Sequence, residues 1–81
     1  MWVPPEQHKA VGRVLSALRK AAGVKQQELA AKLGKPQSFV SSYEAGQRRI
    51  DVLELVRVAQ ALNLDPQEVF AEILRQQPPW R

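Results

Sequence analysis

The sequence predicts an all-α domain, and three observations lead to this fold class. In five segments of the 81-residue chain, apolar residues recur three and four positions apart, the spacing that puts side chains on one face of a helix. Glycines follow three of these segments, as is common where a helix ends (Gly23, Gly34 and Gly46). No segment alternates polar and apolar residues in the manner of a half-buried strand.

The first three helices are expected at residues 5–22, 26–33 and 36–45. In the first, one apolar stripe would face the core and comprises Val11, Val14, Leu15, Leu18, Ala21 and Ala22. The second is expected to bury Leu29, Ala30 and Leu33. The third is short, and its apolar side holds Phe39, Val40 and Tyr43.

Local signals at their N-termini mark the last two helices. Asp51 with Glu54 three residues later has the pattern of a capping box, in which two side chains satisfy free backbone N–H groups reciprocally. The helix that follows would carry a broad apolar stripe of Val52, Leu55, Val56, Val58, Ala59 and Leu62. Asp65 and Pro66 open the fifth helix as an N-cap and a proline at the first helical position, with Glu68 in the first turn. It carries Val69, Phe70, Ile73 and Leu74.

The length suits one small domain over residues 1–81, with a core at about residues 8–75 and loose tails rich in proline and glutamine. The absence of cysteine excludes disulfides, thiolate metal sites and a thiol nucleophile. No apolar run reaches membrane-spanning length and the start lacks a secretory signal, so we expect a cytoplasmic protein.

The net charge of +4 is unevenly distributed. Residues 1–50 hold nine Lys/Arg against three Glu, which gives +6, and residues 51–81 hold three Arg against five Asp/Glu, which gives −2. The positive charge of residues 1–50 suits a phosphate-binding surface, although a solvated basic surface explains this charge equally well.

The polar side of the third helix differs from an ordinary solvated surface. A step of about 100° per residue places five uncharged residues together there, namely Gln37, Ser38, Ser41, Ser42 and Ala45. A face meant only for water would more often carry lysine and glutamate. Amide and hydroxyl groups suit the donors and acceptors on base edges, and glutamine pairs bidentately with adenine in the major groove. The pattern predicts a DNA-binding helix-turn-helix, with side chains that contact only water as the alternative.

Several short motifs in fixed order resemble the Cro/phage-repressor (XRE-like) helix-turn-helix family of transcriptional regulators. They are QQELA at the start of the second helix, the LG turn, QSFVS and YEAG in the third helix, and ALNLDP before the fifth. The resemblance covers residues 11–74, nearly the whole chain. It implies a compact five-helix, lambda-repressor-like fold whose second and third helices form the helix-turn-helix, with the third in the major groove.

The resemblance also implies roles for individual residues. Base contacts fall on the third helix, at Gln37, Ser38, Ser41 and Ser42. Phosphate contacts fall at the start of the second helix and after the third, at Gln26, Gln47, Arg48 and Arg49. Arg19 and Glu44 would form a structural ion pair between helices.

Two helix caps depart from the family pattern. The family usually opens its second and third helices with serine or threonine, whereas this chain has Lys25 and Pro36 at those positions. A missing cap costs about 1 kcal/mol, and a cation near a helix N-terminus opposes the helix dipole. We therefore expect Lys25, and Lys35 beside Pro36, to neutralise phosphates.

These features predict a sequence-specific regulator that binds double-stranded DNA in a bacterium or phage. The expected mode is a repressor that binds a (pseudo)palindromic operator as a homodimer. Apolar residues left over from the core would form the dimer interface, at Leu53, Val56, Phe70 and Leu74, although scattered surface apolar residues are also normal. The alternative function is a partner-binding module of the same fold, such as an antitoxin.

An enzyme is not expected, and neither is a cofactor or a metal. His8 is the only histidine, and no glycine-rich phosphate loop or metal-ligand spacing occurs. The sequence also shows no membrane-surface helix with aromatic anchors and no sign of a small-molecule effector.

Overall fold

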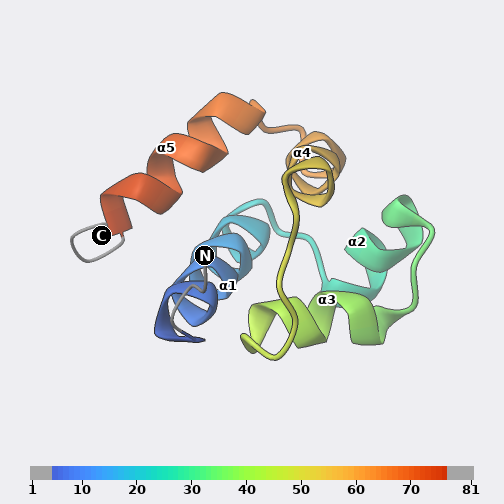
Figure 1. Cartoon of the computed structure of the whole chain (residues 1–81). Helices are drawn as coiled ribbons and strands as arrows, with labels where there is room; N and C mark the ends of the chain where they lie inside the picture. The colour runs from blue at the N-terminus through green and yellow to red at the C-terminus, as the bar shows by residue number, and fades with distance from the viewer. Residues whose placement is uncertain (1–4, 77–81) are drawn as a thin grey trace.

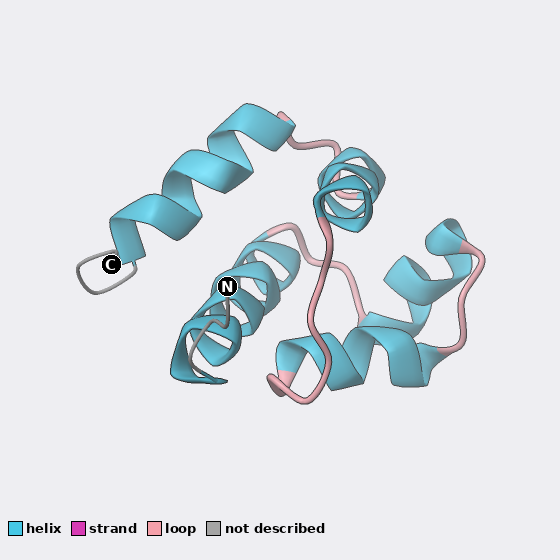
Figure 2. Ribbon diagram, viewed as in Figure 1, coloured by secondary structure: helices cyan, strands magenta, loops and turns pink. Residues whose placement is uncertain are grey.

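The computed structural model describes residues 5–76, and this range contains five α-helices: α1 Pro5–Ala21, α2 Gln26–Leu33, α3 Gln37–Glu44, α4 Val52–Ala61 and α5 Pro66–Gln76 (Figure 1). Loops join them, and the described range holds no strand (Figure 2). The predicted all-α class is confirmed, and the predicted bounds of the first three helices lie within one residue of those observed. Of the tails that we expect to be loose, residues 5–7 and 76 belong to α1 and α5, and the rest lie outside the described residues.

The packing of the helices leaves one side of α3 uncovered. α3 packs against α1 and α2, α4 packs against α2 and α5, and α1 packs against α5. In Figure 1, α2 and α3 lie on the side of the molecule away from α5. The face of α3 that is turned away from α1 and α2 is therefore open to solvent.

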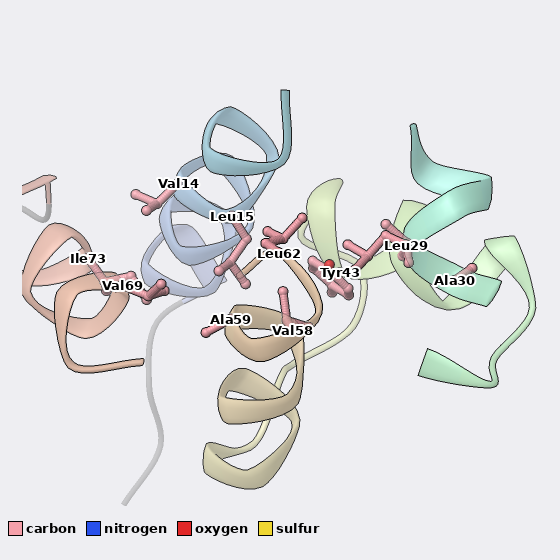
Figure 3. Close-up of a cluster of buried hydrophobic side chains, with 11 residues drawn as sticks. Val14, Leu15, Leu29, Ala30, Tyr43, Val58, Ala59, Leu62, Val69 and Ile73 are labelled. Carbon is pink, nitrogen blue, oxygen red and sulfur yellow. The ribbon is translucent and has the colours of Figure 1, made fainter. Parts of the chain in front are cut away.

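A single cluster of buried apolar side chains joins all five helices (Figure 3). Its members are Val14, Leu15, Leu29, Ala30, Val40, Tyr43, Val58, Ala59, Leu62, Val69 and Ile73. α3 contributes Val40 and Tyr43, which are almost fully buried. These two side chains fix the rotation of α3 about its axis, because turning the helix would expose them to water.

Two of the predicted apolar stripes extend too far along their helices. Ala21 and Ala22, expected in the stripe of α1, are exposed. Val52, expected in the stripe of α4, is 75% exposed, and its neighbour Leu53 is 73% exposed. Because adjacent residues point in different directions, the exposure of both shows that the first turn of α4 projects beyond the helices around it.

The predicted capping box at the start of α4 is confirmed. The backbone N–H of Glu54 donates to Oδ1 of Asp51 at 2.7 Å, and the backbone N–H of Asp51 donates to Oε1 of Glu54 at 3.0 Å. Asp65 caps α5 in a similar way, since its Oδ1 accepts from the N–H of Gln67 at 2.9 Å.

The contact between α1 and α3 depends on Gly12. This glycine is buried in the middle of α1, where a Cβ would collide with the backbone carbonyl oxygens of Tyr43 and Glu44. A glycine within a helix normally costs about 1 kcal/mol relative to alanine, so it usually has a packing reason. Here the missing side chain lets the end of α3 approach the backbone of α1.

Candidate nucleic-acid interface

The turn between α2 and α3 is set by Gly34. Its φ of 67° lies in the left-handed region, which glycine adopts without the strain that a Cβ introduces. The N–H groups of Gly34 and Lys35 donate to the carbonyl oxygens of Ala31 and Ala30, which ends α2. Pro36 is the residue immediately before α3, with a φ of −68° that proline adopts readily. The two helices are thereby joined as a helix-turn-helix.

The exposure of α3 follows the two faces predicted from its sequence. Gln37 and Ser38 are exposed, and Ser41 and Ser42 are partly buried. The hydroxyl of Ser41 donates to the carbonyl oxygen of Ser38 at 3.3 Å. The open face of α3 thus presents one amide and three hydroxyl groups, with no charged side chain among them.

Gln26 connects this face to a buried ion pair. The side-chain Nε2 of Gln37 donates to Oε1 of Gln26 at 3.3 Å, and Nε2 of Gln26 donates to Oε1 of Glu44 at 2.9 Å. Glu44 also accepts two hydrogen bonds from Arg19, at 2.7 Å from Nε and 3.1 Å from Nη2. The first residue of α3 is therefore linked through α2 to a pair whose side chains are only 9% and 6% exposed.

The Arg19–Glu44 pair is the one that the family resemblance implies. Burial alone would raise the pKa of Glu44, but hydrogen bonds from Arg19 and Gln26 outweigh this and hold the pKa below its usual range. The hydrogen bond to Glu44 raises the pKa of Arg19. Arg19 also donates from Nη1 to the carbonyl oxygen of Val24 at 2.7 Å, so it fixes the α1–α2 loop as well.

The N-termini of α2 and α3 carry no side-chain cap from Lys25 or Pro36. Glu28 compensates in part at α2, because its Oε1 accepts from the N–H of Lys25 at 3.0 Å. Only this half of a capping box forms, since a lysine side chain has no acceptor. Lys25 and Lys35 are exposed and form no ion pair within residues 5–76.

The loop after α3 places its two arginines in different environments. Gln47 and Arg49 are exposed, as a phosphate-binding loop requires. Arg48, which we also expect to contact phosphate, is exposed as well and is paired with Glu54 at 2.8 Å. That hydrogen bond lowers the pKa of Glu54. The sequence pattern did not indicate the pair, because the local role of Glu54 as a capping residue already accounts for its presence.

The residues expected at a dimer interface are largely accessible. Leu53, Phe70 and Leu74 are 73%, 54% and 45% exposed, and Val56 is partly buried. Val52 adds to the exposed apolar surface at the start of α4. Within residues 5–76, no helix is long and apolar enough to cross a membrane, and no group of metal-binding side chains occurs.

The helix-turn-helix and the uncharged outer face of α3 define the architecture of a DNA-binding regulator. The sequence profile of the helix-turn-helix family matches residues 15–69. The chain belongs to this family, in its XRE-type branch of transcriptional regulators that bind double-stranded DNA. The family is not an enzyme family.

Individual relatives agree with this assignment. The HTH-type transcriptional regulator y4dJ of Sinorhizobium fredii (strain NBRC 101917 / NGR234) is 36% identical over 64 residues, which cover 79% of this chain and 83% of the relative. An XRE-family like protein from Pseudomonas syringae pv. tomato str. DC3000 has a TM-score of 0.78 at 38% identity, covering 90% of this chain and 89% of its own. The restriction-modification controller protein C.AhdI from Aeromonas hydrophila has a TM-score of 0.74 at 34% identity, covering 80% and 98%.

Proposed function

We propose that this protein is a sequence-specific repressor that binds a two-fold symmetric DNA site as a homodimer. The observation that carries the proposal is the outer face of α3, where Gln37 stands exposed and is held by Gln26. Repression needs only occupancy of the DNA, so it requires no separate activating surface. The DNA of a bacterium or phage lies in the cytoplasm, where we expect the protein to act.

Gln37 has the groups that recognition of adenine requires. One of its two Nε2 protons is used in the hydrogen bond to Gln26. The second proton and the side-chain oxygen remain for the N7 and N6 groups of adenine, which glutamine contacts as a pair. Ser38, Ser41 and Ser42 lie on the same face, and we assign them to further base contacts.

We assign phosphate contacts to two places that flank α3. The first is the N-terminus of α2, where the backbone N–H of Gln26 and the Lys25 side chain meet the anion-binding end of a helix. The second comprises Lys35 before α3 and, after it, Gln47 and Arg49. The three cations among these contacts, Lys25, Lys35 and Arg49, would neutralise three phosphates per subunit and give a salt slope of about −5 for a dimer.

A homodimer would use the exposed apolar residues of α4 and α5, Leu53, Phe70 and Leu74, with Val56 at the edge. A two-fold interface buries the same surface on both copies. It would place the two α3 helices in successive major grooves, about 34 Å apart. The bound site would then read as two inverted copies of one half-site.

The test is selection of bound fragments from a random duplex DNA pool at physiological salt. We expect a two-fold symmetric site, and the Q37A variant should lose its preference at one position of each half-site while the spacing stays the same. Q60A, which removes an exposed glutamine from α4, is the matched control and should select the wild-type site. A single half-site would refute the dimer, and no enrichment by the folded protein would refute DNA recognition in favour of a partner-binding module.

A further inference from the structure

Arg48 lies close to three other side chains, those of Lys35, Phe39 and Glu54. The guanidinium of Arg48 donates two parallel hydrogen bonds to Glu54, from Nη1 to Oε1 at 3.0 Å and from Nη2 to Oε2 at 2.8 Å. Its Cζ lies 4.6 Å from the centre of the Phe39 ring, and Nζ of Lys35 lies 5.6 Å from the same ring. Phe39 itself meets the buried Tyr43 ring edge to face, with centroids 5.5 Å apart.

The guanidinium of Arg48 is also bonded to the next residue in the chain. Nη1 donates to the backbone carbonyl oxygen of Arg49 at 2.7 Å. Three hydrogen bonds therefore use three of the five N–H donors of Arg48, while Glu54 neutralises its charge and Phe39 covers one of its faces. To bind a phosphate with its full charge, Arg48 would first have to leave Glu54.

Arg49 has the opposite environment. Both arginines are exposed, but no hydrogen bond or ion pair engages the guanidinium of Arg49 within the described part of the chain. Its backbone, however, is held by Arg48. The loop is fixed further by the N–H groups of Gln47 and Arg48, which donate to the carbonyl oxygen of Ser42 at 2.9 and 3.3 Å.

We propose that Arg48 is a positioning residue rather than a phosphate contact: anchored by Glu54 and the Phe39 ring, it holds the backbone of Arg49 so that Arg49 meets the phosphate. This inference rests on the proposed DNA-binding function. The two neighbouring arginines then have different roles. Arg49 supplies positive charge to the phosphate, and Arg48 sets the direction of Arg49. Glu54 then serves two loop–helix contacts at once, as the cap of α4 and as the anchor of Arg48.

The first test is E54Q, measured as the affinity for the duplex that the wild-type protein selects. Glutamine still accepts the N–H of Asp51, so the cap of α4 survives, but it cannot pair with both guanidinium nitrogens as a carboxylate does. E28Q is the matched control, because Glu28 is likewise the third residue of its helix and accepts the N–H of the residue before that helix. Within residues 5–76, Glu28 forms no ion pair with an arginine. Both variants remove one negative charge, which by itself favours DNA binding.

We expect E54Q to bind the selected duplex roughly tenfold more weakly, and E28Q to bind it as tightly as the wild type or more tightly. R48K should lose about as much as E54Q, because lysine keeps the charge but cannot make the bidentate contact. Tighter binding by E54Q, or wild-type affinity of R48K, would show that Arg48 acts as a charge on the DNA and would overturn the proposal.

The second test is a double-mutant cycle that asks whether Arg48 acts through Arg49. R49Q should lower the salt slope by about 0.9 per subunit, the value of one phosphate contact. In the E54Q background, R49Q should cost much less affinity than in the wild type, since Arg49 is already misplaced. Equal costs in the two backgrounds would mean that the two arginines act independently, and would overturn the proposal.

A DNA-free measurement separates this inference from the proposed function. Amide hydrogen exchange of Gln47 and Arg48 should be faster in free E54Q than in free E28Q, because only E54Q releases the loop. If the wild-type protein selects no DNA but the exchange rates differ, the DNA-binding function fails while the anchoring of the loop stands. Equal exchange in the two variants would overturn the anchoring itself.

Discussion

Nε2 of Gln26 lies 2.9 Å from Oε1 of Glu44, and this hydrogen bond joins the first residue of α2 to the last residue of α3. Oε1 of Gln26 also accepts a hydrogen bond from Gln37, so two successive hydrogen bonds link Glu44 to the exposed start of α3. The side chain assigned to base recognition is therefore held by residues that do not need to touch a base.

Replacing Gln26 should reduce sequence discrimination without abolishing DNA binding. Q26A leaves Gln37 free to rotate, so we expect a loss of up to about 1 kcal/mol at the base pair that Gln37 contacts. Q37A removes the contact itself and should lose about 1–3 kcal/mol there. The measurement compares dissociation constants for the selected site and for a site changed at that base pair. Equal discrimination by Q26A and the wild type would show that the link is unnecessary.

Breaking the Arg19–Glu44 pair from one side should destabilise the fold strongly. R19A leaves the carboxylate of Glu44 buried without its partner, which costs about 3–5 kcal/mol in the free energy of unfolding measured with urea. R75A is the control, because Arg75 pairs with Glu72 on the exposed side of α5 and its loss should cause no measurable change. A small effect of R19A would mean that water or another donor replaces the arginine.

Stability should fall with acidification because of the same pair. The pKa of Glu44 is held below its usual range in the folded protein, so the unfolded state binds a proton more readily. Folding is then favoured above the unfolded pKa, and this contribution is lost as the pH falls from about 4.5 through the lower folded value. Urea titrations across this range should show a smaller loss in E44Q, which has no carboxylate at that position. An identical pH dependence in E44Q would assign the effect to other carboxylates.

Gly12→Ala should destabilise the protein although alanine is the better helix former. Its Cβ would collide with backbone oxygens of Tyr43 and Glu44, which can move only if α1 and α3 separate. We expect a net loss of about 1–3 kcal/mol, as for other overpacked sites, after the roughly 1 kcal/mol that alanine gains within a helix. Thermal unfolding followed by circular dichroism measures it. A variant more stable than the wild type would show that the two helices are free to adjust.

Lys25→Ser should have opposite effects on stability and on DNA binding. Serine can accept the N–H of Glu28 and thereby complete the capping box that Glu28 already half forms, which contributes about 1 kcal/mol. Loss of the lysine should weaken DNA binding and reduce the salt slope by about 0.9 per subunit. Unchanged affinity and slope would remove Lys25 from the phosphate contacts.

Local patterns predicted the helices and their ends well, because periodicity and caps are properties of neighbouring residues. The capping box of Asp51 and Glu54 is an example, and so is the division of α3 into a polar and an apolar face. What neighbouring residues do not encode is how far an element projects beyond its partners. Val52 lies on the apolar side of α4 in the sequence pattern, yet it is exposed because the first turn of the helix extends past the core.

Contacts between residues of different helices and loops were the other part that the sequence pattern missed. The pairing of Arg48 with Glu54 depends on how the loop after α3 folds back to α4, and the hydrogen bond of Gln26 to Glu44 spans 18 positions. Gly12 left one usable signal, since a glycine inside an otherwise regular helix usually marks a close approach. The residue that it approaches could be identified only from the structure.

The hydrogen bond between Gln26 and Gln37 also limits how this regulator can acquire a new target during evolution. A replacement at residue 37 that lacks an N–H donor would leave the oxygen of Gln26 without its partner, while the other end of that amide stays bound to Glu44. Descendants that recognise a different base are therefore expected to keep a donor at residue 37 or to change residues 26 and 37 together. Inheritance of binding specificity then depends on a pair of positions, one in each helix of the motif.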